Sequence, residues 1–261
     1  MTSLKTHLVI PDTQVKPGVP VEHLHYLGKY IVDLKPDVII HLGDHFDLPS
    51  LSSYDRGTAM IEGKRVVEDI EAGVQGMALI DGPLKALQQA QKRSKKAPYT
   101  PRKVFLLGNH EDRLGRYMNA NPQLIGLLDY DSFELQKNGW EVHEFLKPVD
   151  IDSILYSHYF ASPLSGRPIG GKASNLLQRV GKSFVQGHRQ ELDFTARQLC
   201  DGTRQLGIIA GAFYQHQEEY KGSQGNHHWR GVVVLREVSD GWGDPQMISL
   251  DYLTRKYGEA N

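Results

Sequence analysis

Three features that would narrow the class of this protein are scarce or absent. The chain has one cysteine, Cys200, which excludes an intrachain disulfide and is typical of a reducing compartment. No run approaches the roughly 20 apolar residues that a membrane-spanning helix needs. Neither sign of charge dominates, because the 30 lysines and arginines are nearly equal in number to the 31 aspartates and glutamates. The sequence therefore predicts a protein with no membrane partner and without the overall positive charge of a nucleic-acid binder.

The bulk composition is that of a globular chain, with 39% hydrophobic and 23% charged residues. The first five residues lead directly into a strand-like run and lack the apolar core of a signal peptide, so we expect a cytoplasmic protein. A length of 261 residues would suffice for one sizeable α/β domain or two small ones, and the absence of a linker favours a single domain, 1–261.

Positive charge is concentrated in one short stretch, here called the basic zone. It consists of Lys85, Lys92, Arg93, Lys95, Lys96, Arg102 and Lys103. Such a stretch is either a solvated helix end followed by a surface loop, or a contact zone for a phosphate backbone. The sequence leaves both interpretations open.

Strand-like runs alternate with helical patterns in the first half of the chain. Strands are expected at 6–10, 37–42 and 103–107, and helices at 21–34 and 63–96, with a break of the second helix near Gly82-Pro83 as one alternative. This order predicts a parallel sheet. In the second half, strands are expected at 140–145, 153–159, 183–186, 194–199, 205–210, 231–238 and 247–253, and a helix at 172–180. We predict an α/β fold, a four-layer α-β-β-α sandwich in which two mixed sheets pack face to face with helices outside.

Metal-compatible side chains follow the first three strands. Asp12, Asp44 and Asn109 each come directly after a strand, and ligand sites of open α/β sheets lie at those strand ends. His158 and His188 follow two later strands and add imidazoles. Each residue alone has a simpler explanation, such as a turn for Asp12, a helix N-cap for Asn109 or a structural histidine. Together they supply the oxygen and nitrogen ligands of a pair of divalent cations.

Two such cations, about 3.5–4 Å apart, neutralise a phosphoester and activate water in two-metal hydrolases. The pair needs one shared anionic ligand, and Asp44 on its short loop is suited to that bridging position. Gly43 lets the backbone turn tightly at the crowded centre. The sequence therefore predicts phosphoester hydrolysis at the strand ends.

Five segments together resemble the motifs of the calcineurin-like metallophosphoesterases. They are Asp12-Thr13-Gln14, Gly43-Asp44-His45-Phe46-Asp47, Gly108-Asn109-His110-Glu111, His158, and Gly187-His188-Arg189-Gln190. The resemblance covers residues 10 to about 190. It implies that Asp12 ligates a first metal, that Asp44 bridges both metals, and that Asn109, His158 and His188 ligate a second. It also implies that His110 protonates the leaving oxygen while Asp47 fixes its tautomer.

The chain departs from that pattern at two positions. Gln14 and Gln190 stand where the family has histidines, and both belong to the first metal. A first site built from carboxylate and amide oxygens is harder and weaker, so we expect Mn²⁺ or Mg²⁺ in preference to Zn²⁺, with Fe, Zn and Ni as alternatives. A protein with a single metal and no activity is the alternative. Any of His45, His216, His227 and His228 is a candidate to replace a missing imidazole.

The substrate class is less defined than the metal site. Leu48-Pro49 replaces the Arg-Gly of the protein-phosphatase branch, which disfavours that activity. Arg56, in an expected lid at 49–59, and Arg113 are candidate phosphate contacts, and Tyr214, Tyr220 and Trp229 are candidate stacking partners for a base. We expect a phosphodiesterase, with nucleic-acid cleavage included. The alternatives are a small-molecule phosphomonoesterase and a non-catalytic metal- or nucleotide-binding module. The oligomeric state is not predicted.

Overall fold

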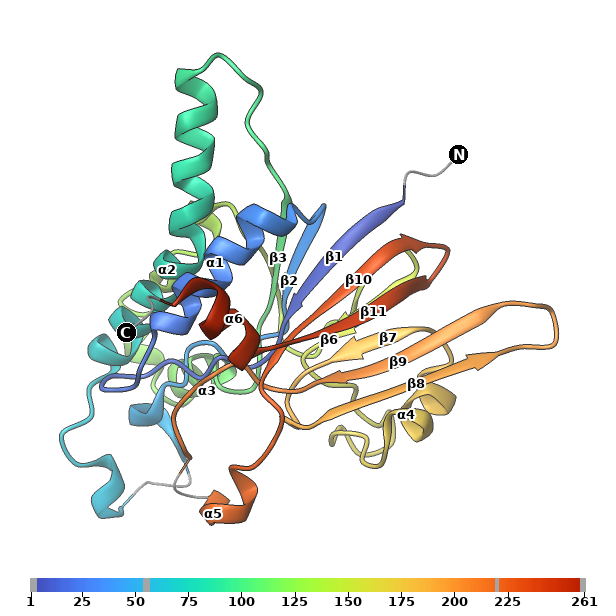
Figure 1. Ribbon diagram of the computed structural model, residues 1–261. Helices are drawn as coiled ribbons and strands as arrows, with labels where there is room; N and C mark the ends of the chain where they lie inside the picture. The colour runs from blue at the N-terminus through green and yellow to red at the C-terminus, as the bar shows by residue number, and fades with distance from the viewer. Residues whose placement is uncertain (1–3, 54–56, 219–220, 259–261) are drawn as a thin grey trace.

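A computed structural model describes residues 4–53, 57–218 and 221–258, and it has the expected α/β architecture of two mixed sheets with helices (Figure 1). The six-stranded sheet has the order β11-β10-β1-β2-β3-β4 and the five-stranded sheet the order β5-β6-β7-β9-β8. The strands of the two sheets are β1 Lys5–Ile10, β2 Val38–His41, β3 Arg102–Leu106, β4 Glu141–His143, β5 Val149–Ile151, β6 Ile154–Ser157, β7 Phe184–Gln186, β8 Leu192–Gln198, β9 Arg204–Ala210, β10 Gly231–Ser239 and β11 Trp242–Ser249. The α-helices are α1 Glu22–Leu34, α2 Val66–Arg93, α3 Asp112–Ala120, α4 Ala173–Val180, α5 Gly222–Gly225 and α6 Leu250–Tyr257.

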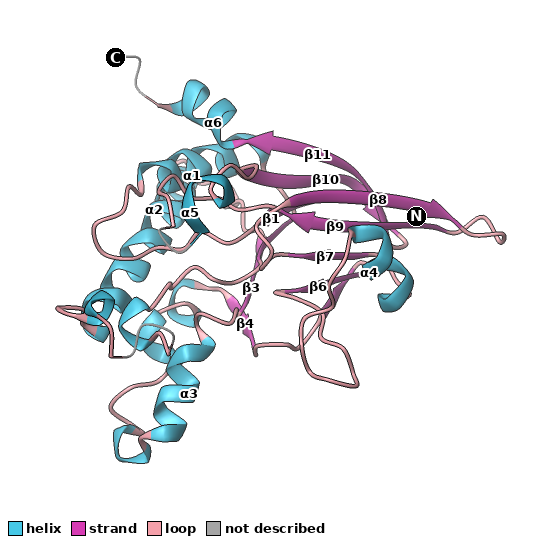
Figure 2. Ribbon diagram, turned by 90° about the horizontal axis from the view of Figure 1, so that it is seen from below, coloured by secondary structure: helices cyan, strands magenta, loops and turns pink. Residues whose placement is uncertain are grey.

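The layers follow from the alternation of side chains along the strands. Leu8 and Ile10 of β1 belong to a core shared with α1, α2 and α6, whereas Val9 between them belongs to a second core. That second core also contains Tyr156 and Ile208 of the other sheet, so the two sheets pack face to face. A third, smaller core joins α4 to the outer face of the five-stranded sheet (Figure 2). The α-β-β-α order of layers agrees with the sequence prediction.

The connections bring several strand ends to one edge. β1, β2 and β3 are mutually parallel, and so are β6, β7 and β9 in the other sheet. Because parallel strands end at the same edge, the loops that follow them lie next to one another. Backbone hydrogen bonds tie these loops together: the Gln14 N–H donates to the Asp44 carbonyl at 2.9 Å, and the Gly187 N–H donates to the His158 carbonyl at 3.0 Å.

Helix α2 is continuous through the Gly82-Pro83 pair, at which the sequence suggested a break. The reason lies in its contact with α1. A Cβ atom on Gly28 would lie 2.6 Å from the Ile80 carbonyl oxygen and 2.9 Å from the Pro83 ring, so the two helices cross with Gly28 against this turn. The helix therefore continues through Pro83 while this turn is packed closely against α1.

The sequence prediction is wrong at the C-terminal end of the fold. A strand was expected at 247–253, but β11 ends at Ser249 and α6 begins at Leu250. The Ser249 hydroxyl accepts from the Tyr252 N–H and caps the helix, while Leu250 and Leu253 face the core at helical spacing. Helix α3, which follows residues 108–111, was not among the expected helices, although a helix N-cap at Asn109 was one alternative. Among the described residues, no helix combines the length and the apolar character needed to cross a membrane.

Candidate metal centre

Four side chains from four loops converge at the shared edge of the two sheets. Asp44 follows β2, Asn109 follows β3, His158 follows β6 and His188 follows β7. One ligand atom each of Asp44, His158 and His188 lies within 4.8 Å of the others. The Asn109 Oδ1 atom lies 2.8 Å from His158 Nε2 and 2.7 Å from His188 Nδ1. The structure therefore brings the residues predicted for the second metal into one cluster.

The hydrogen-bond pattern of His158 shows that this cluster fits a cation. Its Nδ1–H donates to the Leu42 carbonyl at 2.9 Å, which places the lone pair of a neutral ring on Nε2. That nitrogen faces two further acceptors, Asn109 Oδ1 and, at 3.3 Å, Asp44 Oδ2. Acceptors that converge in a buried place need either a proton or a cation between them. A backbone-anchored imidazole is also the usual arrangement of a metal-ligating histidine.

The electrostatics of the cluster agree with this interpretation. Burial would lower the pKa of His158, but the Asp44 carboxylate outweighs it and raises the pKa to about 9. Burial would raise the pKa of Asp44, but His110 and His158 hold it well below its ordinary value. Burial and the neighbouring His158 lower the pKa of His188 to about 4, so this imidazole is neutral and offers a lone pair. Without a cation, the negative charge of Asp44 is balanced by protonated histidine.

The predicted first position is built from Asp12, Gln14 and Gln190. Burial and the Asp44 carboxylate raise the pKa of Asp12 to about 6, which shows two acidic groups close together in a buried place. The Gln14 side chain is 1% exposed, and its Oε1 atom has no hydrogen-bond partner among the described residues. A buried amide oxygen without a hydrogen-bond partner also fits a cation.

Gln190 has a different environment from Gln14. Its Nε2 faces Asp12 Oδ2 at 3.4 Å, and its Oε1 accepts from the Tyr214 hydroxyl at 2.8 Å. In this orientation Gln190 presents its NH₂ group to the Asp12 carboxylate, and its oxygen already accepts one hydrogen bond from Tyr214. The two glutamines that the sequence treats alike therefore differ: only Gln14 has a free oxygen.

The backbone at the centre is strained. Gln14, Asp44, His188 and Gln190 have φ angles of 40°, 50°, 67° and 59°, in the left-handed region that non-glycine residues avoid. Such strain persists where the surrounding structure imposes it, often at functional sites. Gly43 adopts φ 93°, and a Cβ atom there would lie 2.4 Å from the Leu106 carbonyl oxygen. The tight turn expected at Gly43 is therefore confirmed.

Glu111 is a structural residue to which the sequence analysis assigned no role. Its fully buried carboxylate accepts four backbone hydrogen bonds, from the N–H groups of Asp44, His45, Phe46 and Gly108, at 2.7–2.8 Å. Burial and the nearby Asp44 carboxylate raise the pKa of Glu111 to about 7, against the effect of these donors. Glu111 thereby fixes the loop that carries Asp44 to the loop that carries Asn109.

His110 and Asp47 form the pair that the resemblance implies. His110 Nδ1 lies 2.5 Å from Asp47 Oδ1, and His110 Nε2 lies 3.7 Å from Asp44 Oδ2. Burial would lower the pKa of His110, but Asp44 and Asp47 outweigh it and raise the pKa. Arg113 donates to the Asp47 carbonyl at 2.7 Å and lies 3.2 Å from His110 Nε2. The guanidinium is thus beside Nε2 of His110, the nitrogen that faces Asp44.

A charged network extends from Asp47, and no pattern in the sequence indicates it. Lys16 Nζ lies 3.0 Å from Asp47 Oδ2 and donates to both oxygens of Glu218, at 2.8 and 2.9 Å. His216 Nε2 lies 2.7 Å from Glu218 Oε1. Lys16 is one of several residues between β1 and α1, and Glu218 lies before α5, so only the fold brings them together.

Several residues singled out from the sequence lie elsewhere or have other contacts. His45 is buried between Thr13 Oγ1, at 2.7 Å, and the Gly73 carbonyl, at 2.8 Å, so it supports the loop and faces no candidate ligand. Trp229 packs against Gly211 and Gly231, and Tyr214 is fully buried. His216 contacts Glu218, His228 contacts the Gly225 carbonyl, and His227 is exposed, none of them at the cluster. Arg56 and Tyr220 lie outside the described residues.

The basic zone lies at the opposite edge of the sheet from the cluster. Arg102 opens β3, whereas Asn109 follows its other end. Lys85 and Lys103 bind Asn138 and Asp81, and Arg102 pairs with Glu141. The remaining basic residues are exposed at the C-terminal end of α2, which projects beyond the start of β3 (Figure 1). A nucleic acid bound there would not run directly over the cluster.

Comparisons with known proteins give relatives but no family. The chain is 27% identical to the Gene 54 protein of Mycobacterium phage L5 over 251 residues, 94% of each protein. It is 28% identical to the Gene 54 protein of Mycobacterium phage D29 over 190 residues, 70% of this chain and 68% of the relative. No protein-family model matches. One solved crystal structure aligns over 95% of this chain and 100% of its own, at 12% identity and a TM-score of 0.39.

Proposed function

We propose that this protein is a divalent-metal-dependent phosphoester hydrolase of the calcineurin-like type, and that it acts on phosphodiesters. One observation carries the proposal: a buried cluster of acceptors, namely Asp44 Oδ2, Asn109 Oδ1, His158 Nε2 and His188 Nδ1, lies beside the His110–Asp47 pair. A cation site next to a carboxylate-oriented histidine is the arrangement that phosphoester cleavage requires.

The ligand set supports two positions of unequal strength. Asn109, His158 and His188, with Asp44, would hold one cation, and Asp12, Asp44 and the Gln14 oxygen would hold the other. Divalent cations there would neutralise the substrate phosphate and activate water. The oxygen-only position favours Mn²⁺ or Mg²⁺, and it is the weaker of the two because Gln190 is engaged by Tyr214.

The protein groups have distinct tasks in this proposal. His110 Nε2 faces the cluster and delivers a proton to the leaving oxygen, while Asp47 holds the ring by its Nδ1. Arg113 lies 3.2 Å from His110 Nε2, close enough to donate to a phosphate oxygen that approaches this nitrogen. Leu48 and Pro49 supply no second arginine, which favours a diester over a doubly charged phosphomonoester.

The test is turnover under controlled metal content. Protein treated with EDTA is given Mn²⁺, Mg²⁺ or Zn²⁺ and assayed with bis-p-nitrophenyl phosphate and p-nitrophenyl phosphate. We expect Mn²⁺-dependent cleavage, faster for the diester, and loss of cleavage in Asp44→Asn. Faster cleavage of the monoester would point to a phosphomonoesterase. If neither ester is cleaved although metal binds, the chain is a metal-binding module rather than an enzyme.

A further inference from the structure

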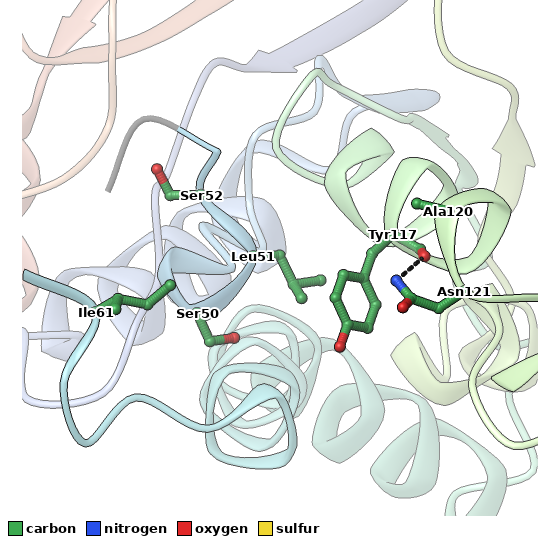
Figure 3. Close-up of a pocket in the computed structure, with 7 residues that line it drawn as sticks. All are labelled: Ser50, Leu51, Ser52, Ile61, Tyr117, Ala120 and Asn121. Atoms are coloured by element: carbon green, nitrogen blue, oxygen red, sulfur yellow. Dashed lines mark hydrogen bonds between the residues drawn. The ribbon is translucent and has the colours of Figure 1, made fainter. Parts of the chain in front are cut away.

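A groove of about 470 Å³ lies between the 3₁₀ turn Pro49–Leu51 and the C-terminal part of α3 (Figure 3). Its lining includes Ser50, Leu51, Ser52, Ile61, Tyr117 and Asn121. Figure 3 shows the Tyr117 side chain directed from α3 toward Leu51 and Ser50. The volume lies within the range of small-molecule sites. Nothing in the roles assigned to the metal centre uses this groove.

Both walls of the groove continue directly from the His110–Asp47 pair. Ser50 follows Asp47 by three residues on one wall. On the other wall, Tyr117 lies one helical turn beyond Arg113, on the same face of α3 and about 6 Å further along its axis. Because Arg113 contacts both Asp47 and His110, both walls start from residues next to that pair.

The chemistry of the lining selects a particular kind of ligand. Its residues carry an aromatic ring, aliphatic side chains, hydroxyls and an amide, and none of them carries a charge. A phosphate would find no charged partner there. A flat ring with polar edges would stack on Tyr117 and exchange hydrogen bonds with Ser52 or Asn121, which is how proteins hold nucleobases without base pairing.

We propose that this groove binds the nucleobase of a nucleotide whose phosphodiester lies at the metal centre. The inference rests on the proposed function and specifies its substrate class as nucleotidyl esters. The base comes either from a free nucleotide or from the end of a nucleic-acid strand, and these two sources share the same chemistry in the groove.

Binding tests the groove without requiring turnover. Thymidine 5′-monophosphate is titrated by calorimetry into the full chain with Mn²⁺, and into Tyr117→Ala, Tyr117→Phe and Tyr252→Ala. We expect about a tenfold or greater loss of affinity for Tyr117→Ala, because the base loses its stacking partner, and little change for Tyr117→Phe, which keeps the ring. Tyr252→Ala is the matched control, since Tyr252 is an exposed tyrosine on α6. Equal affinity in Tyr117→Ala would overturn the proposal.

Kinetics separate this inference from the proposed function. Thymidine 5′-p-nitrophenyl phosphate carries a base, and methyl p-nitrophenyl phosphate does not. We expect Tyr117→Ala to raise KM about tenfold for the first and to leave the second unchanged. Cleavage of both esters at an unaltered ratio would overturn the groove alone. Cleavage of neither, with Tyr117-dependent nucleotide binding, would overturn the enzyme and keep the groove. Competition by a short single-stranded oligonucleotide against thymidine 5′-monophosphate identifies the source of the base.

Discussion

The ammonium of Lys16 lies 2.8 Å from the Glu218 carboxylate, although 202 residues separate them in the chain. The same ammonium lies 3.0 Å from Asp47, which in turn holds His110. Burial would lower the pKa of Lys16, but Asp47 and Glu218 outweigh it and raise the pKa, so the lysine is charged. This ion pair connects the segment before α5 to the catalytic histidine of the proposed mechanism.

Replacement of Lys16 by methionine should destabilise the fold, because two buried carboxylates lose their shared counter-ion. Loss of one partner of a buried ion pair costs about 3 kcal/mol. Urea unfolding of Lys16→Met should show this decrease in the free energy of unfolding. The double variant Lys16→Met/Glu218→Met should recover part of it, since one orphaned charge is removed as well. Equal stability of Lys16→Met and the parent would mean that solvent replaces the ammonium.

The metal-free protein should lose stability as the pH rises from about 6.5 to about 9. The folded-state pKa of His158 is raised to about 9 by Asp44, against an ordinary value of 6.5. Protonated His158 therefore stabilises the fold fully below pH 6.5, and this contribution disappears as the pH rises through 9. The loss amounts to about 3 kcal/mol at most.

Thermal unfolding in EDTA at pH 6.5, 7.5 and 9 measures this loss. Mn²⁺ should abolish it, because a cation then takes the position of the proton. His158→Gln should make the profile in EDTA shallower between pH 7.5 and 9, above the range in which Glu111 titrates, whereas His25→Gln, on α1 away from the cluster, should not. A profile that stays steep in His158→Gln would assign the effect to another group.

The general arrangement of this site is predictable from the sequence because parallel strands end at a common edge. Asp44 and Asn109 follow successive parallel strands, so their convergence needs only the strand order. His158 and His188 come from the second sheet, and their arrival at the same cluster depends on how the two sheets stack. The motif resemblance predicted that these two histidines join the cluster. Hydrophobic periodicity alone does not predict it.

Other features depend on tertiary contacts that no local pattern encodes. The left-handed backbone of Asp44 and His188 is imposed by neighbouring loops, including the four backbone donors around Glu111. The Lys16–Glu218 pair joins two segments without regular structure. Helix α6 was mistaken for a strand because the stretch 247–253 contains enough apolar residues for either period, and the Ser249 cap decides between them.

The two glutamines of the weaker metal position should respond differently to substitution. Gln14→His places an imidazole where an amide oxygen has no partner, so Zn²⁺ affinity at this position should rise. Gln190→His first has to break the contact with Tyr214, so a smaller gain is expected unless Tyr214→Phe is added. Calorimetric titration of EDTA-treated protein with Zn²⁺ and Mn²⁺ measures both effects. Unchanged affinity in Gln14→His would place Gln14 outside the ligand set.

His110→Ala should separate metal binding from catalysis. The side chain contacts Asp47 and Arg113, while the Asn109 oxygen and the two cluster histidines stay in place. Loss of a general acid slows turnover by roughly 10²–10⁴. We therefore expect kcat for bis-p-nitrophenyl phosphate to fall by that factor with Mn²⁺ affinity nearly unchanged. Asp47→Asn should have a smaller effect on kcat, because it keeps a hydrogen-bond partner for Nδ1.

The leaving group tests the role of His110 as a proton donor. A diester with a p-nitrophenolate leaving group needs less protonation than one with an alkoxide, so the defect of His110→Ala should be larger for a dinucleotide. An equal defect for both substrates would assign His110 to phosphate stabilisation instead of proton transfer.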